Sequence, residues 1–131
     1  MQVKLITPEK IFFSGDAVQV DAPGTEGVFG VLPGHAPFIS TLKAGLVNIE
    51  LASGEHKRFV VLSGIAEITP ESVTLLAEVA EDCSGMNSAD VSSRLSAAKS
   101  AMDTAIGEDQ KKIASQSLMM AEAIADALKA A

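Results

Sequence analysis

The chain has 131 residues, of which 47% are hydrophobic, so it has the length of one ordinary domain, or of a small domain with an appendage, and can bury a core. Ten basic and seventeen acidic side chains give a net charge of −7, which repels phosphate backbones and anionic lipid head groups and argues against nucleic acid as a partner. Because no apolar run approaches the roughly 18 residues of a membrane span, and the first residues lack a signal or transit pattern, we expect a cytoplasmic protein without direct membrane insertion.

Short runs of alternating apolar and polar residues predict β structure from residue 2 to about residue 82. The runs are Val3 to Ile6, Ala17 to Asp21, Gly45 to Leu51, Arg58 to Ser63, Ile65 to Thr69 and Val73 to Val79. Residues that favour turns separate many of them, at Thr7 to Lys10, Ser14 to Asp16, Ala52 to Glu55 and Thr69 to Ser72. The predicted inner face is apolar and consists of Leu46, Ile49, Leu51, Phe59, Val61, Leu75 and Val79. A spacing of roughly ten residues per strand favours an antiparallel β-sandwich over βαβ units.

The stretch from Gly24 to Pro37 is rich in both glycine and proline. Glycine reaches positive φ at little cost, and proline fixes φ and removes a hydrogen-bond donor, so this stretch predicts a shaped and fairly rigid loop at the edge of the sandwich. The spacing of Gly24, Gly27 and Gly30 is not that of a dinucleotide-binding fingerprint, and Pro33 follows where a helix would have to run. A phosphate-binding loop is therefore disfavoured.

The composition changes between Asp82 and Ser88, beyond which alanine dominates. This change predicts a β-sandwich domain over residues 1–86 and a helical domain over residues 87–131. Asn87 or Ser88 can cap the first helix, and Gly107 is the expected stop between two helices. Apolar or small residues recur three and four apart on each side of Gly107, which predicts an antiparallel helical hairpin. They are Val91, Leu95, Ala98, Met102 and Ala105, then Ile113, Ser117, Met120, Ile124 and Leu128.

Candidates for catalysis or metal binding are few. His35 and His56 lie in separate segments without the spacing of a metal site, so a structural or interface role is favoured for each. Cys83 is the single cysteine, and we interpret it as a stray thiol near the domain junction rather than as a nucleophile. No serine lies in a GxSxG nucleophile elbow. We therefore expect neither an enzyme nor a bound metal or cofactor.

A glycine at every third residue from Gly24, followed by Pro33-Gly34-His35-x-Pro37, resembles the signature loop of the epsilon subunit of F-type ATP synthases. The likeness covers the whole chain: a β-rich part, a short junction and a terminal pair of helices. It implies a sandwich of about ten strands and a non-catalytic subunit of the central stalk. Such a subunit binds gamma and the ring of c subunits and couples proton flow to ATP synthesis. It also implies a peripheral position on the cytoplasmic face of the bacterial inner (plasma) membrane.

The resemblance assigns roles within this stretch. Contact with the c-ring is implied for Gly24, Thr25, Glu26, Gly27, Val28, Phe29 and Gly30. Contact with gamma is implied for Pro33, Gly34 and His35. Other members often carry an acidic or polar residue where this chain has Val28, which leaves Glu26 as the loop's only charge for pairing with a basic residue of the ring.

The resemblance also implies that the C-terminal helices inhibit ATP hydrolysis by contacting the catalytic subunits through basic side chains. Here acidic residues balance the basic residues of the predicted hairpin, so we expect weak inhibition. The basic residues are Arg94, Lys99, Lys111, Lys112 and Lys129, and the acidic residues are Asp90, Asp103, Glu108, Asp109, Glu122 and Asp126.

Several bacterial epsilon subunits bind ATP through an Asp and an Arg three residues apart on a helix. The nearest match here is Asp90 and Arg94, which are four apart, and an ion pair within the helix is favoured over a nucleotide site. The alternative function is a free-standing β-sandwich that binds a ligand and whose helical tail senses ATP.

Overall fold

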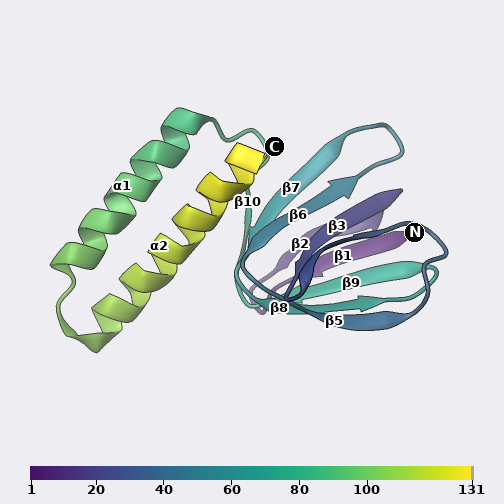
Figure 1. Ribbon diagram of the computed structural model, residues 1–131, viewed down its shortest axis with the longest axis horizontal. Helices are drawn as coiled ribbons and strands as arrows, with labels where there is room; N and C mark the ends of the chain where they lie inside the picture. Colours follow the sequence, from purple (N-terminus) through teal and green to yellow (C-terminus); the bar gives the residue numbers. More distant parts are fainter. Residues whose placement is uncertain (131) are drawn as a thin grey trace. The chain divides into compact units, whose positions relative to one another are not determined.

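The structure is a computed structural model that describes residues 1–130, and its chain divides into two compact units. The first unit, Met1–Ser84, holds the strands, and the second begins at Gly85 and holds two helices (Figure 1). The strands are β1 (Gln2–Ile6), β2 (Ile11–Asp16), β3 (Gln19–Gly24), β4 (Gly27–Val31), β5 (Phe38–Leu42), β6 (Gly45–Glu50), β7 (His56–Val61), β8 (Gly64–Ile68), β9 (Ser72–Ala77) and β10 (Ala80–Asp82). The helices are α1 (Ser88–Thr104) and α2 (Gly107–Ala130). The predicted fold, a β-sandwich of about ten strands followed by a helical hairpin, is confirmed.

The strands are hydrogen-bonded in the order β10-β7-β6-β3-β5-β8-β9-β1-β2, and β4 pairs with β3 beside this path. β3 joins the two halves of the sandwich: it pairs with β6 through Gln19, Val20 and Asp21, but with β5 through Gly24 alone. Neighbouring strands run antiparallel except β1 and β9, which are parallel and come from opposite ends of the unit's sequence. This parallel pair places the N-terminal strand inside the sheet, between β9 and β2.

The sandwich core consists of side chains that alternate along the strands. Val47 and Ile49 on β6 are fully buried, whereas Leu46, which the sequence placed on the inner face, is half-buried. Successive side chains of a strand point to opposite faces, so Leu46 and Ile49 lie on different faces of β6. Burying a valine, leucine or isoleucine contributes about 1.5–3 kcal/mol. The largest fully buried side chains of the sandwich are Val3, Leu5, Val20, Val31, Val47, Ile49, Val60, Val61, Ile68, Val73 and Leu75.

Some local predictions for the sandwich are wrong. Ser14 to Asp16, predicted as a turn, belong to β2. The alternating runs also omitted β2, β4, β5 and β10. β4 contains two glycines, which have low β propensity, and β10 has only three residues. Pairing with β3 and with β7, rather than their own composition, keeps β4 and β10 extended.

The helical hairpin begins at the predicted cap. The Asn87 side chain accepts a hydrogen bond from the Asp90 backbone N–H at 2.8 Å, which satisfies one of the open donors of α1. Gly107 is not a stop after α1: the helix ends at Thr104, and Gly107 is the first residue of α2, with φ +81°. Ile113 was expected on the apolar face but is 67% exposed. The buried positions of the hairpin are Val91, Ala98, Ala114, Met120, Ala121, Ile124 and Ala127.

Neither α1 nor α2, as far as Ala130, combines the length and the hydropathy that a membrane-spanning helix needs.

Candidate functional site

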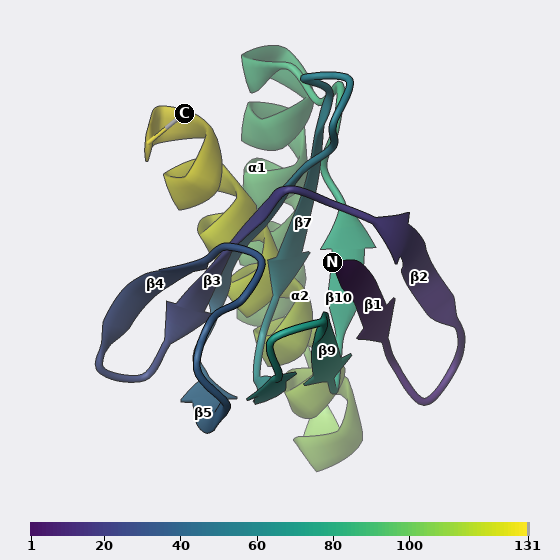
Figure 2. The ribbon, with the colours of Figure 1, turned by 90° about the vertical axis from the view of Figure 1, so that its right-hand side faces the viewer.

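The stretch predicted as a glycine loop is a β-hairpin, here called the glycine hairpin (Gly24–Gly30). β3 and β4 pair from Val20–Val31 to Gly24–Gly27, and Thr25 and Glu26 make the turn. Figure 2 shows this hairpin reaching outward next to β5. The predicted loop at the edge of the sandwich is therefore two paired strands with a tight turn, because pairing with β3 outweighs the low strand propensity of the glycines.

Gly24 and Gly27 are required for different reasons. A Cβ at Gly24 would lie 2.8 Å from the Gly27 carbonyl oxygen and 2.9 Å from Cδ1 of Phe29, so a side chain there would clash. A Cβ at Gly27 would meet nothing within 4 Å, but its φ of +135° is an angle that other residues rarely adopt. The first glycine makes room for the Phe29 ring, and the second allows the turn.

The tip of the glycine hairpin is exposed but tied to β5. Thr25, Glu26 and Val28 are exposed, and Val28 has 74% of its surface in solvent. The hydroxyls of Thr25 and Thr41 share a hydrogen bond of 2.8 Å, and the Thr25 N–H donates to the Thr41 carbonyl at 3.1 Å. The tip therefore presents an apolar side chain and one carboxylate from a backbone held at a defined position.

The predicted gamma contacts, Pro33, Gly34 and His35, form the turn between β4 and β5. The Gly34 N–H donates to the Pro70 carbonyl at 2.9 Å, which joins this turn to the turn between β8 and β9. The His35 Nδ1 donates to the Ala36 carbonyl at 2.8 Å. The Gly34 bond holds the Pro33–His35 turn against the turn between β8 and β9, and the His35 bond fixes the imidazole ring beside its own backbone.

Phe38 brings the two predicted contact segments together. Its ring centroid lies 5.4 Å from that of Phe29 in the glycine hairpin and 5.1 Å from that of His35 in the turn. The planes of the two phenylalanine rings meet at 75°, which is the favourable edge-to-face geometry. Phe38 carries no signal of its own in the sequence, because its role depends on which rings lie on either side of it in the fold.

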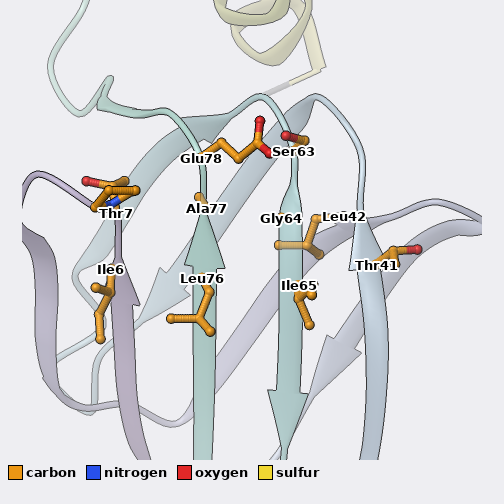
Figure 3. A pocket seen from close by; sticks show the side chains of 11 residues that line it. Ile6, Thr7, Thr41, Leu42, Ser63, Gly64, Ile65, Leu76, Ala77 and Glu78 are labelled. Carbon is orange, nitrogen blue, oxygen red and sulfur yellow. The ribbon is translucent and has the colours of Figure 1, made fainter.

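A groove of about 650 Å³ crosses the outer face of β1, β9, β8 and β5. Figure 3 shows Ile6, Leu76 and Ile65 in a row on neighbouring strands, as their register pairs require. Thr41 pairs with Ile65, so the row ends at the residue that holds the hairpin tip. We call this surface the apolar groove; its lining is Ile6, Thr7, Pro8, Thr41, Leu42, Ser63, Gly64, Ile65, Leu76, Ala77 and Glu78.

The apolar groove was missed at the level of sequence, although a signal for it exists. Leu75 and Leu76 are consecutive in β9, so one of them must face outward; Leu75 is buried and Leu76 is 48% exposed. Ile65 is 47% exposed and Ile39, on β5, is 71% exposed. Contiguous exposed apolar side chains on a folded domain mark an interaction surface.

The remaining candidate residues belong to neither the glycine hairpin, the Pro33–His35 turn nor the lining of the apolar groove. Asp90 and Arg94 lie one turn apart on α1. Cys83 is buried, and burial together with the neighbouring Asp82 carboxylate raises the pKa of its thiol, the opposite of what a nucleophilic cysteine requires. His56 lies on β7, where its Nε2 is 3.5 Å from a Glu50 carboxylate oxygen. Within residues 1–130, no three His, Cys, Asp or Glu side chains gather as metal ligands. The exposed features that remain are suited to binding by shape and apolar contact.

The sequence of the chain is similar to those of known proteins. The family model for the beta-sandwich domain of the ATP synthase Delta/Epsilon chain matches residues 1–83. An ATP synthase epsilon chain of Bradyrhizobium sp. is 53% identical over 76 residues, a match that covers 58% of this chain and spans 56% of the relative's length. The epsilon chain of Rhodospirillum rubrum is 37% identical over 128 residues, 98% of this chain and 96% of the relative.

Two solved structures share the fold. The Euglena gracilis mitochondrial ATP synthase, described as OSCP/F1/c-ring, contains a chain with a TM-score of 0.70 at 19% identity, covering 96% of this chain and 79% of that one. The central stalk/c-ring of the Tetrahymena thermophila mitochondrial enzyme contains one with a TM-score of 0.56 at 14% identity, covering 96% and 94%. These structures show the fold, whereas the family follows from the family model and from the nearly full-length match to the Rhodospirillum chain. The chain belongs to the ATP synthase delta/epsilon family, among the epsilon chains.

Proposed function

We propose that this chain is a non-catalytic rotor subunit of a proton-translocating F-type ATP synthase, in which it binds gamma and the c-ring and couples proton flow to ATP synthesis. Membership of the epsilon family supports this role, as do the structural neighbours, which come from F1/c-ring and central stalk/c-ring complexes. The observation that carries the proposal is the pair of exposed surfaces on one sandwich, the glycine hairpin and the apolar groove, which meet at Thr25 and Thr41.

The glycine hairpin is the proposed contact with the c-ring. An exposed ion pair contributes only about 0.2–1 kcal/mol, so Glu26 alone would hold a basic ring residue weakly. Val28, which is 74% exposed, adds apolar surface to that contact. The hairpin would therefore act mainly through its shape, which the pairing with β3 and the bond to Thr41 keep constant.

The apolar groove is the proposed contact with gamma. Ile65 and Leu76 are about half exposed in the isolated chain, and covering their exposed halves would contribute about 1 kcal/mol each. The Pro33–His35 turn lies at the start of β5 and Thr41 near its end, so β5 connects the two parts of the proposed gamma surface. In this arrangement the subunit sits peripherally at the cytoplasmic face of the bacterial inner membrane.

The test measures the affinity of the Leu76→Glu variant for gamma, with Leu76→Met as the matched control. Leu76 is 48% exposed, so a carboxylate there stays hydrated in the free chain and the sandwich keeps its fold, which circular dichroism checks. Covering that carboxylate with gamma removes its hydration, so we expect affinity to fall at least about tenfold. Leu76→Met conserves volume and should bind like the unsubstituted chain. Equal affinity of Leu76→Glu and the unsubstituted chain for gamma would place the gamma surface elsewhere, and absence of any binding would overturn the proposed function.

A further inference from the structure

We propose that Phe38 is a positioning residue that couples the glycine hairpin to the Pro33–His35 turn, so that a displacement at the c-ring contact is passed to the gamma contact. The inference rests on the proposed function, because it assumes that the two segments meet different partners. Phe38 itself belongs to neither contact set. It is half-buried, packs against the sandwich core and is the first residue of β5.

The backbone ties β3 and the tip of the glycine hairpin to β5, where the Thr25 N–H donates to the Thr41 carbonyl, but within residues 1–130 the strand pairing leaves β4 without such a tie. β3 is tied, since Gly24 pairs with Leu42 and the Lys43 N–H donates to the Pro23 carbonyl at 2.9 Å. β4, however, pairs only with β3 within residues 1–130. The contact between the rings of Phe29 and Phe38, at 5.4 Å, therefore ties β4 to β5 through side chains.

The same ring continues to the turn. The centroid of the His35 ring lies 5.1 Å from that of Phe38 with the ring planes tilted by 53°, and the Gly34 N–H donates to the Pro70 carbonyl. A movement of β4 is thus opposed first by Phe38 and then by a turn that is anchored to the rest of the sandwich. Gly24 makes this possible, because a Cβ there would lie 2.9 Å from the Phe29 ring.

Replacing Phe38 by leucine keeps an apolar side chain but removes the ring that Phe29 and His35 both touch. We expect the hairpin to open locally more often, and the exchange rates of the hairpin amides to rise about tenfold. The fold should be unaffected, since Phe38 lies outside the cluster of buried core side chains. Gamma affinity should change little, because the apolar groove is unchanged and the bond from the Gly34 N–H to the Pro70 carbonyl still anchors the Pro33–His35 turn.

The experiment compares Phe38→Leu with Phe38→Tyr, which keeps the ring, and with Phe12→Leu. Phe12 is the matched control because it is also half-buried and makes an edge-to-face pair, with Phe59 at 6.3 Å, but lies on β2. Three quantities are measured for each chain: amide hydrogen exchange in the hairpin, affinity for gamma, and proton-driven ATP synthesis in membranes reconstituted without the native epsilon chain.

The expected result is specific to the loss of the ring at position 38. Phe38→Leu should speed hairpin exchange and lower ATP synthesis several-fold while gamma affinity stays within about twofold of the unsubstituted chain. Phe38→Tyr and Phe12→Leu should match the unsubstituted chain in all three measurements.

Several results would overturn the inference. One is unchanged exchange in Phe38→Leu, which would mean that the ring does not hold the hairpin. Another is faster exchange with normal ATP synthesis, which would mean that the position of the hairpin does not matter for coupling. The same losses in Phe38→Tyr or Phe12→Leu would also overturn it. Failure of the proposed function has a different signature, because then the unsubstituted chain itself would neither bind gamma nor restore synthesis.

Discussion

At the residue scale, the glycine hairpin shows how identical residues serve different physical ends. Gly24 is needed for space and Gly27 for its backbone angle. At Gly30 a Cβ would lie 2.9 Å from an Asp21 carboxylate oxygen, the end of a side chain that can move aside, so the need for space is weaker there than at Gly24. The regular spacing of the three glycines, which is visible in the sequence, therefore conceals two distinct requirements.

The residue-scale prediction is that Gly27→Val lowers proton-driven ATP synthesis by changing the shape of the tip. A valine at φ +135° costs about 1–3 kcal/mol of backbone strain but meets no neighbour within 4 Å, so the turn should distort while the sandwich stays folded. Gly54→Val is the matched control, because Gly54 has φ +88°, has equally free surroundings and lies in the turn between β6 and β7.

The measurement is ATP synthesis in reconstituted membranes, alongside the free energy of unfolding of each variant. The free energy of unfolding should fall by a similar amount in both variants, and only Gly27→Val should lower proton-driven ATP synthesis. Normal synthesis with Gly27→Val would rule out docking through the hairpin, and equal losses in both variants would attribute the effect to stability.

At the element scale, the two units differ in the size of the side chains that they bury. The sandwich core draws on side chains from Val3 to Ala77 and includes many fully buried valines, leucines and isoleucines. The buried face of α2 relies instead on Met120, Ile124 and small residues such as Ala121 and Ala127. Alanine allows helices to approach closely but contributes little buried area. We therefore expect the helical hairpin to be less stable than the sandwich.

The element-scale prediction is that a fragment of residues 1–84 folds alone and still binds gamma. The core cluster is complete without the helices, and β10 is held within the sandwich by its pairing with β7 and by the hydrogen bond from the Cys83 N–H to the Arg58 carbonyl at 3.0 Å. Cooperative thermal unfolding and an affinity for gamma close to that of the full chain are expected. If the fragment aggregates and becomes soluble only when the helices are restored, the helical hairpin completes the core of the sandwich.

At the scale of the whole molecule, the question is whether the C-terminal hairpin regulates hydrolysis. Its basic and acidic side chains nearly balance, with each exposed pair contributing about 0–1 kcal/mol, so strong electrostatic capture by the catalytic subunits is not expected. Exposed apolar side chains remain available for docking, among them Ile106 and Met119, which are 80% and 52% exposed. The combination favours weak inhibition.

The prediction at this scale is that removing the helices raises ATP hydrolysis only modestly. The assembled complex is assayed with the full chain and with the fragment of residues 1–84, at low and at high salt. We expect a rise of about fivefold or less, the factor that about 1 kcal/mol provides, and little dependence on salt. A rise of two orders of magnitude on truncation would contradict weak inhibition.

The sequence by itself determined the features that depend on neighbouring residues. Alternation along β1, β6, β8 and β9 predicted strands because side chains on one face share one environment. Asn87 predicted the start of α1 because a cap acts within one turn. The glycine and Pro-Gly-His pattern indicated the family, because it is local and specific.

Only the tertiary structure decided the features that depend on distant partners. β4 is a strand because β3 pairs with it, since its two glycines give it only a weak strand preference of its own. Ile6, Leu76 and Ile65 form one row because β9 pairs with β1 on one side and with β8 on the other, which brings together segments about 70 residues apart in the chain. The position of Phe38 between Phe29 and His35 is also set by the tertiary structure. The contacts among these rings depend on how β4, β5 and the turn between them are arranged in space, which the order of residues along the chain does not show.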